Sequence, residues 1–316
     1  MKTTVILCSY NHCQSLARTL ESLAASILPA EVGWEVLVVD NNSNDRTREV
    51  VEGFCRQFPE HFRYLHEPRP GKSFALNSGI AQANADLVAF LDDDVTVEPT
   101  WLHNLTANLL NGEWDGAGGK IILGWPEVLP PWLATKGPYS RTPFPDFDKG
   151  CEPRQLTEPP FGTNMAFRKE VFQVHGGFRL DLGPSPNREI PCPHEDTEFG
   201  YRLMAAGKRL RYEPSAIVYH PIAPDRITKK YFLHWWFDEG RASARVFGVR
   251  AGTKWYFAGI PLYLVRSLGL WSLRWMLSME PHARFYYKIV VWGKLGRISE
   301  HFRQRLELKS KKECNA

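Results

Sequence analysis

The stretch that decides the fold is LVAFLDDD, residues 87–94, in which five apolar residues run directly into three aspartates. A short apolar run of this length is typical of a strand buried inside a sheet. Three adjacent carboxylates at its end repel one another unless a cation neutralises them, and such oxygen ligands suit Mg²⁺ or Mn²⁺. Because acidic residues also favour the start of a helix, residues 92–94 indicate either a metal site or a helix N-terminus.

The segments on both sides of this stretch alternate between strand and helix patterns. The predicted strands are residues 3–9, 34–40, 62–66, 161–168 and 211–220, and the predicted helices are residues 14–28, 46–58, 73–83 and 195–206. This alternation predicts an α/β fold with a mainly parallel central sheet flanked by helices. Further on, residues 231–246 mix aromatic and charged residues and predict a helix pair or hairpin.

Polar residues follow three of the predicted strands at the point where each strand ends. They are Ser9-Tyr10-Asn11, Asp40-Asn41-Asn42 and Asp92-Asp93-Asp94. Ligands of open α/β sheets bind beyond the carboxyl ends of the strands. We therefore expect these three groups to contribute to one binding site.

A second acidic pair, Glu195-Asp196, opens a predicted helix after a segment rich in Pro and Gly. The pair is either a helix cap, or it includes a general base that takes a proton from an attacking hydroxyl group. His220 ends the last predicted strand, where it is either a metal ligand or a structural histidine. The residues alone leave both alternatives open.

Residues 124–160 have a different composition from the segments around them. They contain nine prolines with aromatic residues between them, including Trp125. We expect an irregular segment, which serves either as a structural connection or as a recognition loop beside a site.

Charge is distributed unevenly along the chain. The formal net charge is +4, but residues 226–316 hold 18 Lys/Arg and 6 Asp/Glu, a net of +12, which leaves −8 for residues 1–225. A basic C-terminal part of this kind suggests an anionic surface as its partner. Nucleic acid is excluded as that partner, because the front part is acidic and no nucleic-acid-binding motif is present.

The basic part also contains a predicted amphipathic helix. Its apolar face is formed by Leu264, Leu268, Trp271 and Trp275. Arg266 and Arg274 on the same helix disfavour a membrane-spanning segment, whereas Trp and Arg together fit an element bound to an anionic membrane surface. The alternative is a helix that packs in a homodimer interface or against the rest of the chain.

Cysteine usage and the N-terminus bear on the compartment. The six cysteines lack the paired spacing of a zinc site or a disulfide framework, and the short apolar segment near the N-terminus lacks the length of a signal-peptide core. We therefore expect a cytoplasmic protein that is peripheral on the inner face of the cell membrane.

Taken together, these segments resemble the inverting glycosyltransferases of family 2, which have the GT-A fold. The resemblance covers about residues 3–220 and lies in the order and spacing of short motifs. They are CSYN (8–11), VVDNNS (38–43), GKS (71–73), ALNSGI (75–80), FLDDD (90–94), GTNMAFR (162–168), GGF (176–178) and ED (195–196) with RL (202–203). The resemblance implies a GT-A catalytic domain at residues 1–225, followed by a helical region at residues 226–316.

The resemblance also implies roles for individual residues. Asp92 and Asp94 match the D-x-D motif that holds Mn²⁺ or Mg²⁺ against a nucleotide diphosphate, and His220 matches a histidine that completes this metal site. Asp196 matches the general base, with Glu195 beside it in the catalytic pair. The positions matched to nucleotide contacts are Ser9, Tyr10, Asn11, Asp40, Asn42, Lys72, Asn77, Asp92 and Asp93. The positions expected to contact the donor or acceptor sugar are Asn164, Trp125 and Gly177.

The activity implied by the resemblance is sugar transfer from a nucleotide-diphosphate sugar, with a UDP-sugar expected, to a hydroxyl group of a glycan or lipid-linked acceptor. Transfer is expected to occur by a single displacement with inversion, and a divalent metal ion offsets the charge on the leaving group. Two alternatives remain open. One is a GT-A transferase that retains configuration, and the other is a non-catalytic protein that binds nucleotide sugars.

Overall fold

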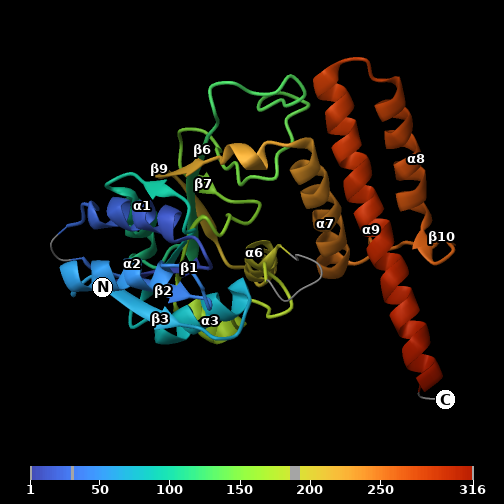
Figure 1. Ribbon diagram of the computed structural model, residues 1–316. Helices are drawn as coiled ribbons and strands as arrows, with labels where there is room; N and C mark the ends of the chain where they lie inside the picture. The colour runs from blue at the N-terminus through green and yellow to red at the C-terminus, as the bar shows by residue number, and fades with distance from the viewer. Residues whose placement is uncertain (1, 30–31, 186–192, 315–316) are drawn as a thin grey trace. The chain divides into compact units, whose positions relative to one another are not determined.

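The computed structural model describes residues 2–29, 32–185 and 193–314 (Figure 1). The chain groups into two compact units. The first unit comprises residues 1–124, 145–189 and 195–221, and the second comprises residues 125–144, 190–194 and 222–316. Residues 125–144 of the Pro-rich segment therefore belong to the same unit as the C-terminal helices.

The first unit is built on a mixed sheet. Its strands are β1 (Lys2–Ser9), β2 (Gly33–Asp40), β3 (Phe62–His66), β4 (Leu87–Leu91), β5 (Thr96–Val97), β6 (Gly116–Gly124), β7 (Arg154–Gln155), β8 (Asn164–Arg168) and β9 (Leu210–Pro221). Its helices are α1 (Cys13–Ala24), α2 (Thr47–Gln57), α3 (Lys72–Gln82), α4 (Trp101–Thr106), the 3₁₀ turn η1 (Ala107–Leu109), α5 (Glu170–His175) and α6 (Glu195–Ala205). The predicted α/β architecture is confirmed.

The order of strands in the sheet is β3-β2-β1-β4-β8-β6-β9-β5, and β7 pairs with β9. β1 runs parallel to both β2 and β4, whereas β8 runs antiparallel to β4 and β6. The carboxyl ends of β1, β2 and β4 therefore meet at one edge of the sheet. At this edge Ser9 pairs with Asp40, and Leu91 immediately precedes the three aspartates.

Helices cover both faces of this sheet (Figure 1). Val5 and Leu7 of β1 pack in one core with Leu16 of α1, whereas Ile6 packs in the other core with Leu76 of α3. Because consecutive side chains of a strand point to opposite faces, a strand buried on both sides reads as a continuous apolar run. This explains why β1, β2 and β4 lack the alternating pattern of a half-exposed strand.

The second unit is mainly helical. Its elements are the 3₁₀ turn η2 (Pro224–Arg226), α7 (Lys229–Phe247), the short hairpin strands β10 (Tyr256–Phe257) and β11 (Ile260–Pro261), α8 (Leu262–Leu277) and α9 (Pro281–Cys314). The expectation of a helix pair over residues 231–246 is wrong, because α7 continues through this whole segment. Among the residues that the structure describes, no helix combines the length and apolarity needed to cross a membrane.

Helices α7 and α9 lie side by side with closely packed backbones (Figure 1). A Cβ atom at Gly240 would overlap the carbonyl oxygen of Gly293, and one at Gly296 would overlap the carbonyl oxygen of Phe237. The glycines therefore permit an approach that alanine would prevent. The carboxylate of Glu300 is fully buried and accepts hydrogen bonds from Arg245 of α7 at 2.7 Å and from Arg303 of α9 at 2.6 Å.

Helix α8 packs against α9 through the apolar face that the sequence predicts. The ring centroids of Trp271 and Tyr287 are 5.8 Å apart, and those of Trp275 and Trp292 are also 5.8 Å apart. Leu264 on the same face is buried. This face therefore packs within the chain, as one of the two alternatives predicted, and does not form the exposed side of the helix.

We predict that Glu300→Gln lowers the free energy of unfolding by about 1–3 kcal/mol, because the partly buried arginines around Glu300 lose their counter-charge. Burial raises the pKa of Glu300, but hydrogen bonds from Arg303 and Arg245 outweigh this effect and lower it from 4.5 to about 2. A carboxylate whose pKa is lowered by folding stabilises the folded state at pH values above its pKa in the unfolded chain. This contribution is lost as pH falls from about 4.5 towards 2. Urea unfolding at several pH values measures both effects.

The matched control is Glu49→Gln, which removes an exposed ion pair with Arg46. We expect this variant to stay within about 0.5 kcal/mol of the wild type, since exposed pairs contribute little. Equal losses in the two variants would show that Glu300 has no special role in holding α7 to α9.

Candidate functional site

An ion pair lies at the carboxyl edge of the sheet in the first unit. Lys72, the first residue of α3, places its Nζ atom 2.7 Å from Oδ1 of Asp92 and 3.7 Å from Oε1 of Glu195. The other oxygen of Asp92 accepts a hydrogen bond of 2.5 Å from the hydroxyl of Thr163. Lys72 and Thr163, which are distant from Asp92 in the sequence, thus converge on its carboxylate.

The local electrostatics of this group are strongly perturbed. Burial raises the pKa of Glu195 to about 7, an effect that Lys72 reduces and the neighbouring Asp196 reinforces. Burial alone lowers the pKa of Lys72, but the charges of Asp92 and Glu195 outweigh it and hold the pKa well above its ordinary value. Lys72 is therefore a firmly charged cation among carboxylates.

Asp196 lies in the first turn of α6, beside Glu195. Its Oδ2 atom accepts a hydrogen bond from the backbone N–H of Gly162 at 2.7 Å, and its Oδ1 atom accepts one from the N–H of Thr197 at 2.6 Å. These two bonds fix the orientation of the carboxylate. The side chain is only partly buried, so it combines a fixed orientation with access from solvent.

Asp94 and His220 form a second pair at this edge, with 3.7 Å between Oδ1 of Asp94 and Nε2 of His220. Nδ1 of the buried His220 lies 3.2 Å from the carbonyl oxygen of Pro221. Because a carbonyl oxygen can only accept, Nδ1 carries the proton in the neutral ring and Nε2 keeps its lone pair on the side of Asp94. The arrangement matches that of a metal-binding histidine whose other nitrogen is held by a backbone carbonyl.

The predicted ligand set fits a divalent cation in part. Over residues 2–29, 32–185 and 193–314, no group of three His, Cys, Asp or Glu side chains is close enough to hold a metal ion. Asp94 supplies an oxygen donor, which suits Mn²⁺ or Mg²⁺, and His220 supplies a nitrogen donor, which favours Mn²⁺ over the oxygen-preferring Mg²⁺. Asp92 instead uses its oxygens to bind Lys72 and Thr163.

The ends of β1 and β2 carry several of the residues predicted to bind a nucleotide. Asp40 is buried and accepts hydrogen bonds from the N–H of Ser43 at 2.9 Å and from the hydroxyl of Tyr64 at 2.8 Å. Burial and the bond to Asp40 raise the pKa of Tyr64 to about 12. Asn11 and Asn42 have positive φ angles of 56° and 68°, a conformation that Asn tolerates better than most residues.

Two buried polar atoms at this edge have no hydrogen-bond partner within the described part of the chain. They are Oγ of Ser9 and Oδ2 of Asp93, and the other oxygen of Asp93 lies 3.2 Å from Nδ1 of His12. Tyr10, which follows the last residue of β1, is 37% exposed. A buried polar atom without a partner is costly unless a ligand or water satisfies it.

Two of the predicted residues use their side-chain amides to bond other parts of the chain. Asn164 is fully buried, and its amide bonds Trp101, the carbonyl of Lys120 and the carbonyl of Ala216. The amide of Asn77 binds both backbone groups of Phe178. Both amides are engaged in hydrogen bonds within the protein, with Asn164 fully buried and Asn77 half-buried.

The two remaining predicted sugar contacts have neighbours of their own. Gly177 lies against the Asn77 amide, where a Cβ atom would overlap it. Trp125 belongs to the second unit, and its ring centroid is 5.6 Å from that of Phe144.

Three partners of the site residues were missed by sequence reasoning. They are Thr163, which binds Asp92, Tyr64, which binds Asp40, and His12, which contacts Asp93. Thr163 follows Gly162 within the motif GTNMAFR, so a signal was present but named no role. Tyr64 and His12 carry no local signal, because only the pairing of the strands brings them to the aspartates.

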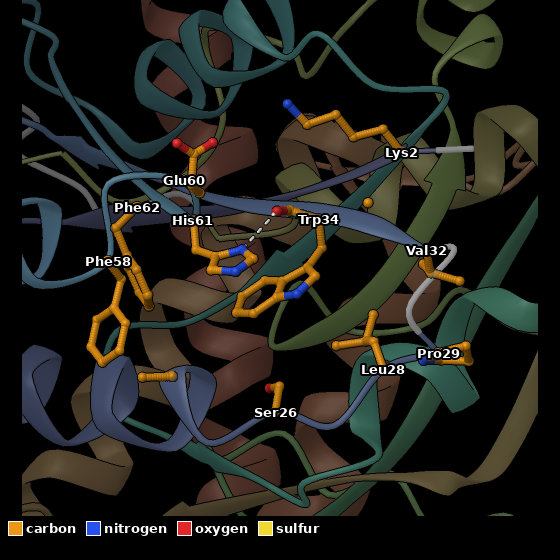
Figure 2. Close-up of a pocket in the computed structure, with 12 residues that line it drawn as sticks. Lys2, Ser26, Leu28, Pro29, Val32, Trp34, Phe58, Glu60, His61 and Phe62 are labelled. Atoms are coloured by element: carbon orange, nitrogen blue, oxygen red, sulfur yellow. Dashed lines mark hydrogen bonds between the residues drawn. The ribbon is translucent and has the colours of Figure 1, made fainter.

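A pocket of about 650 Å³ lies at the opposite edge of the sheet (Figure 2). It is lined by residues at the starts of the first three strands, among them Lys2, Trp34 and Phe62, and Trp34 stacks on His61 with 4.3 Å between ring centroids. A smaller hollow of about 370 Å³ lies at the carboxyl edge beside Asn11. Cavity volume alone would select the pocket at the opposite edge of the sheet. We assign the candidate site to the carboxyl edge because of the charged side chains there.

We predict that Thr163→Val lowers the free energy of unfolding by about 1–3 kcal/mol, because Asp92 loses a hydrogen bond while the shape of the side chain is kept. Urea unfolding measures this loss. Thr163→Ser keeps the hydroxyl group and should recover most of the stability. If Val and Ser cost the same, the bond to Asp92 contributes nothing and only packing of the methyl group matters.

Comparison with known proteins gives the family. Residues 4–176 match the family model described as Glycosyl transferase family 2. The chain is 29% identical over 246 residues to the succinoglycan biosynthesis protein ExoM of Rhizobium meliloti, which covers 78% of this chain and 75% of that protein. It is 27% identical over 235 residues to a glucosyl-dolichyl phosphate glucuronosyltransferase of Haloferax volcanii, with 70% of each chain covered.

A similar fold is found among solved structures. The mannosyltransferase PcManGT from Pyrobaculum calidifontis, solved in complex with GDP-Man and Mn²⁺, superposes with a TM-score of 0.58 at 16% identity. The match covers 96% of this chain and 86% of that one. With the family model matched over more than half of its length, the chain belongs to glycosyl transferase family 2 and is a glycosyltransferase with the GT-A fold.

Proposed function

We propose that the protein transfers a sugar from a nucleotide-diphosphate sugar to a hydroxyl group of a glycan or lipid-linked acceptor, by a single displacement with inversion. The observation that carries this proposal is the Asp196 carboxylate, which is held by two backbone N–H groups. The charge of Asp196 helps to raise the pKa of Lys72, as the charge of Asp92 does, so both carboxylates interact with the same cation. A fixed, accessible carboxylate in such a group suits a general base.

In the proposed reaction Asp196 takes the proton of the acceptor hydroxyl as its oxygen attacks the anomeric carbon. The bond between this carbon and the diphosphate oxygen breaks, and the nucleoside diphosphate leaves with the electron pair. Lys72, charged and adjacent to Asp92, stabilises the negative charge of the diphosphate. The anomeric configuration of the product, read by NMR, distinguishes this displacement from a reaction that retains configuration.

The Asp94–His220 pair supports a divalent cation, Mn²⁺ or Mg²⁺, as cofactor. Nε2 of His220 keeps its lone pair on the side of Asp94, as a metal ligand requires. When bound, the ion offsets the charge that develops on the leaving diphosphate. PcManGT, which shares the fold, was solved with Mn²⁺. Asp92 is proposed to contribute through its position beside Lys72.

The nucleotide is proposed to bind over the ends of β1, β2 and β4. Ser9 and Asp93 each keep a buried oxygen that finds no partner in the described residues, and hydroxyl groups of a ribose can satisfy them. Asp40, Tyr10 and Asn11 surround the same strand ends. A UDP-sugar is the first donor to test, and a GDP-sugar is the second, because PcManGT was solved with GDP-Man.

The acceptor is proposed to be a glycan or a lipid-linked saccharide at the cytoplasmic face of the membrane. Two relatives support this class by their names, since one is a succinoglycan biosynthesis protein and the other a glucosyl-dolichyl phosphate glucuronosyltransferase. The basic second unit is consistent with an anionic surface as a partner.

We predict that Asp196→Asn lowers kcat about 10²–10⁴-fold, because the amide cannot accept the proton. Donor affinity, measured by calorimetry, should change little. Glu198→Gln is the matched control on the same helix, since this acid pairs with Arg202 one turn away and should affect turnover only slightly. Wild-type turnover in Asp196→Asn would show that another group is the base.

We also predict that transfer stops in excess EDTA and returns with Mn²⁺. His220→Gln should raise the Mn²⁺ concentration needed for half-maximal activity at least about 10–100-fold, since it removes a ligand. His103→Gln, which changes a histidine of α4, should behave as the wild type. Full activity in EDTA would contradict the assignment of a metal to Asp94 and His220.

A further inference from the structure

The stretch from residue 240 to residue 279 contains no Asp or Glu. It holds six cationic residues, Arg241, Arg245, Arg250, Lys254, Arg266 and Arg274. The first two contact Glu300 of α9. Lys254, Arg266 and Arg274 are exposed. This part of the second unit therefore presents positive charge with no acidic residue of its own to balance it.

The hairpin in this stretch displays aromatic side chains to solvent. Trp255, Tyr256 and Phe257 are 75%, 53% and 65% exposed. The chain turns at Ala258 and Gly259, which have positive φ angles of 50° and 82° as a tight hairpin turn requires. A side-chain hydrogen bond from Arg305 of α9 to the carbonyl of Ala258 ties the turn to the helix. Three adjacent exposed aromatic residues on a tethered hairpin are unusual for a surface in contact with water alone.

Helix α8, which follows the hairpin, has a second apolar face besides the one packed on α9. Leu270, Leu273 and Leu277 are 50%, 49% and 71% exposed. Their spacing of three and four places them on one side of the helix, and Arg266 extends the same row towards the hairpin. The helix has 16 residues and is therefore about 24 Å long. We call the three aromatic residues and these three leucines the hairpin–α8 surface.

We propose that the hairpin–α8 surface inserts into the headgroup region of an anionic lipid bilayer, with the aromatic residues of the hairpin entering deepest. Trp and Tyr favour the boundary between lipid and water, and a helix with an apolar face and flanking arginines lies in its plane. Each cation near an anionic membrane adds about 1 kcal/mol of attraction at the surface, equal to about fivefold in affinity. This deepens the proposed function by naming the surface that brings the enzyme to a lipid-linked acceptor.

Charge favours a bilayer over a second copy of the chain. A symmetric dimer brings the same patch of two subunits together. Arg266, Arg274 and Lys254 would then face their own copies with no carboxylate from residues 240–279 to pair with, which opposes association. Anionic phospholipid headgroups supply the missing negative charge.

Sedimentation of the full chain with lipid vesicles tests the proposal. We expect binding to vesicles of phosphatidylcholine with added phosphatidylglycerol, and about 10–100-fold weaker binding to phosphatidylcholine alone. Replacing all three aromatic residues, Trp255→Ser, Tyr256→Ser and Phe257→Ser, should weaken binding at least about 100-fold. Arg266→Gln with Arg274→Gln should reduce binding only where phosphatidylglycerol is present.

The control variant, Ile27→Ser with Val174→Ser, removes exposed apolar side chains from the first unit, where these residues are 63% and 73% exposed. Its vesicle binding should equal that of the wild type. The circular dichroism of every variant should match the wild type, and all should hydrolyse sugar nucleotide in solution at the wild-type rate. If the wild type did not hydrolyse sugar nucleotide, the proposed reaction would be contradicted, whereas the proposal of membrane binding would be unaffected.

Three results would overturn the membrane proposal. One is absence of wild-type binding to phosphatidylglycerol vesicles, and another is undiminished binding by the aromatic triple variant. The third is a dimeric wild type and a monomeric triple variant in analytical ultracentrifugation, with equal vesicle binding by the two proteins. That result would assign the surface to self-association.

Discussion

The ion pair between Lys72 and Asp92 is the interaction on which the candidate site depends. The aspartates 92–94 and the pair Glu195-Asp196 bring five carboxylates to the first unit, and their mutual repulsion has to be offset for the chain to fold in this way. Lys72 supplies a cation 2.7 Å from Asp92 and 3.7 Å from Glu195. The offset is incomplete, because burial and the charge of Asp196 still raise the pKa of Glu195 to about 7. A group that is short of positive charge in this way favours a divalent cation and its diphosphate.

Sequence reasoning predicts the sheet well, because its signals are local. Apolar runs such as residues 87–91 become buried strands, and each is followed by polar residues at the carboxyl edge. It cannot predict which partners meet there, because the bond from Thr163 to Asp92 spans 71 positions of the chain. Nor does it predict that the amides of Asn77 and Asn164 bond distant backbone groups.

The second unit shows a different limit of the same reasoning. The row of Leu264, Trp271 and Trp275 reads as one apolar face, and the structure packs it against α9. Leu270, Leu273 and Leu277 form another apolar face of the same helix, which is exposed. Periodicity alone does not tell which of the two faces packs against the rest of the chain. The uneven charge of the chain gains a structural meaning from this arrangement. In the first unit Asp92 and Glu195 share the cation of Lys72, whereas the cations of residues 240–279 border an exposed apolar surface.

The measurement that tests the central claim most directly is a thermal-shift series of nucleoside diphosphates and sugar nucleotides, each with and without Mn²⁺. If the carboxyl edge binds a metal–diphosphate pair, one nucleotide together with Mn²⁺ should raise Tm by about 5 °C or more at saturating concentration, and neither should do so alone. The rise should be much smaller in Asp94→Asn. The account would be contradicted if no nucleotide shifted Tm in the presence of Mn²⁺, or if the shift were unchanged in Asp94→Asn.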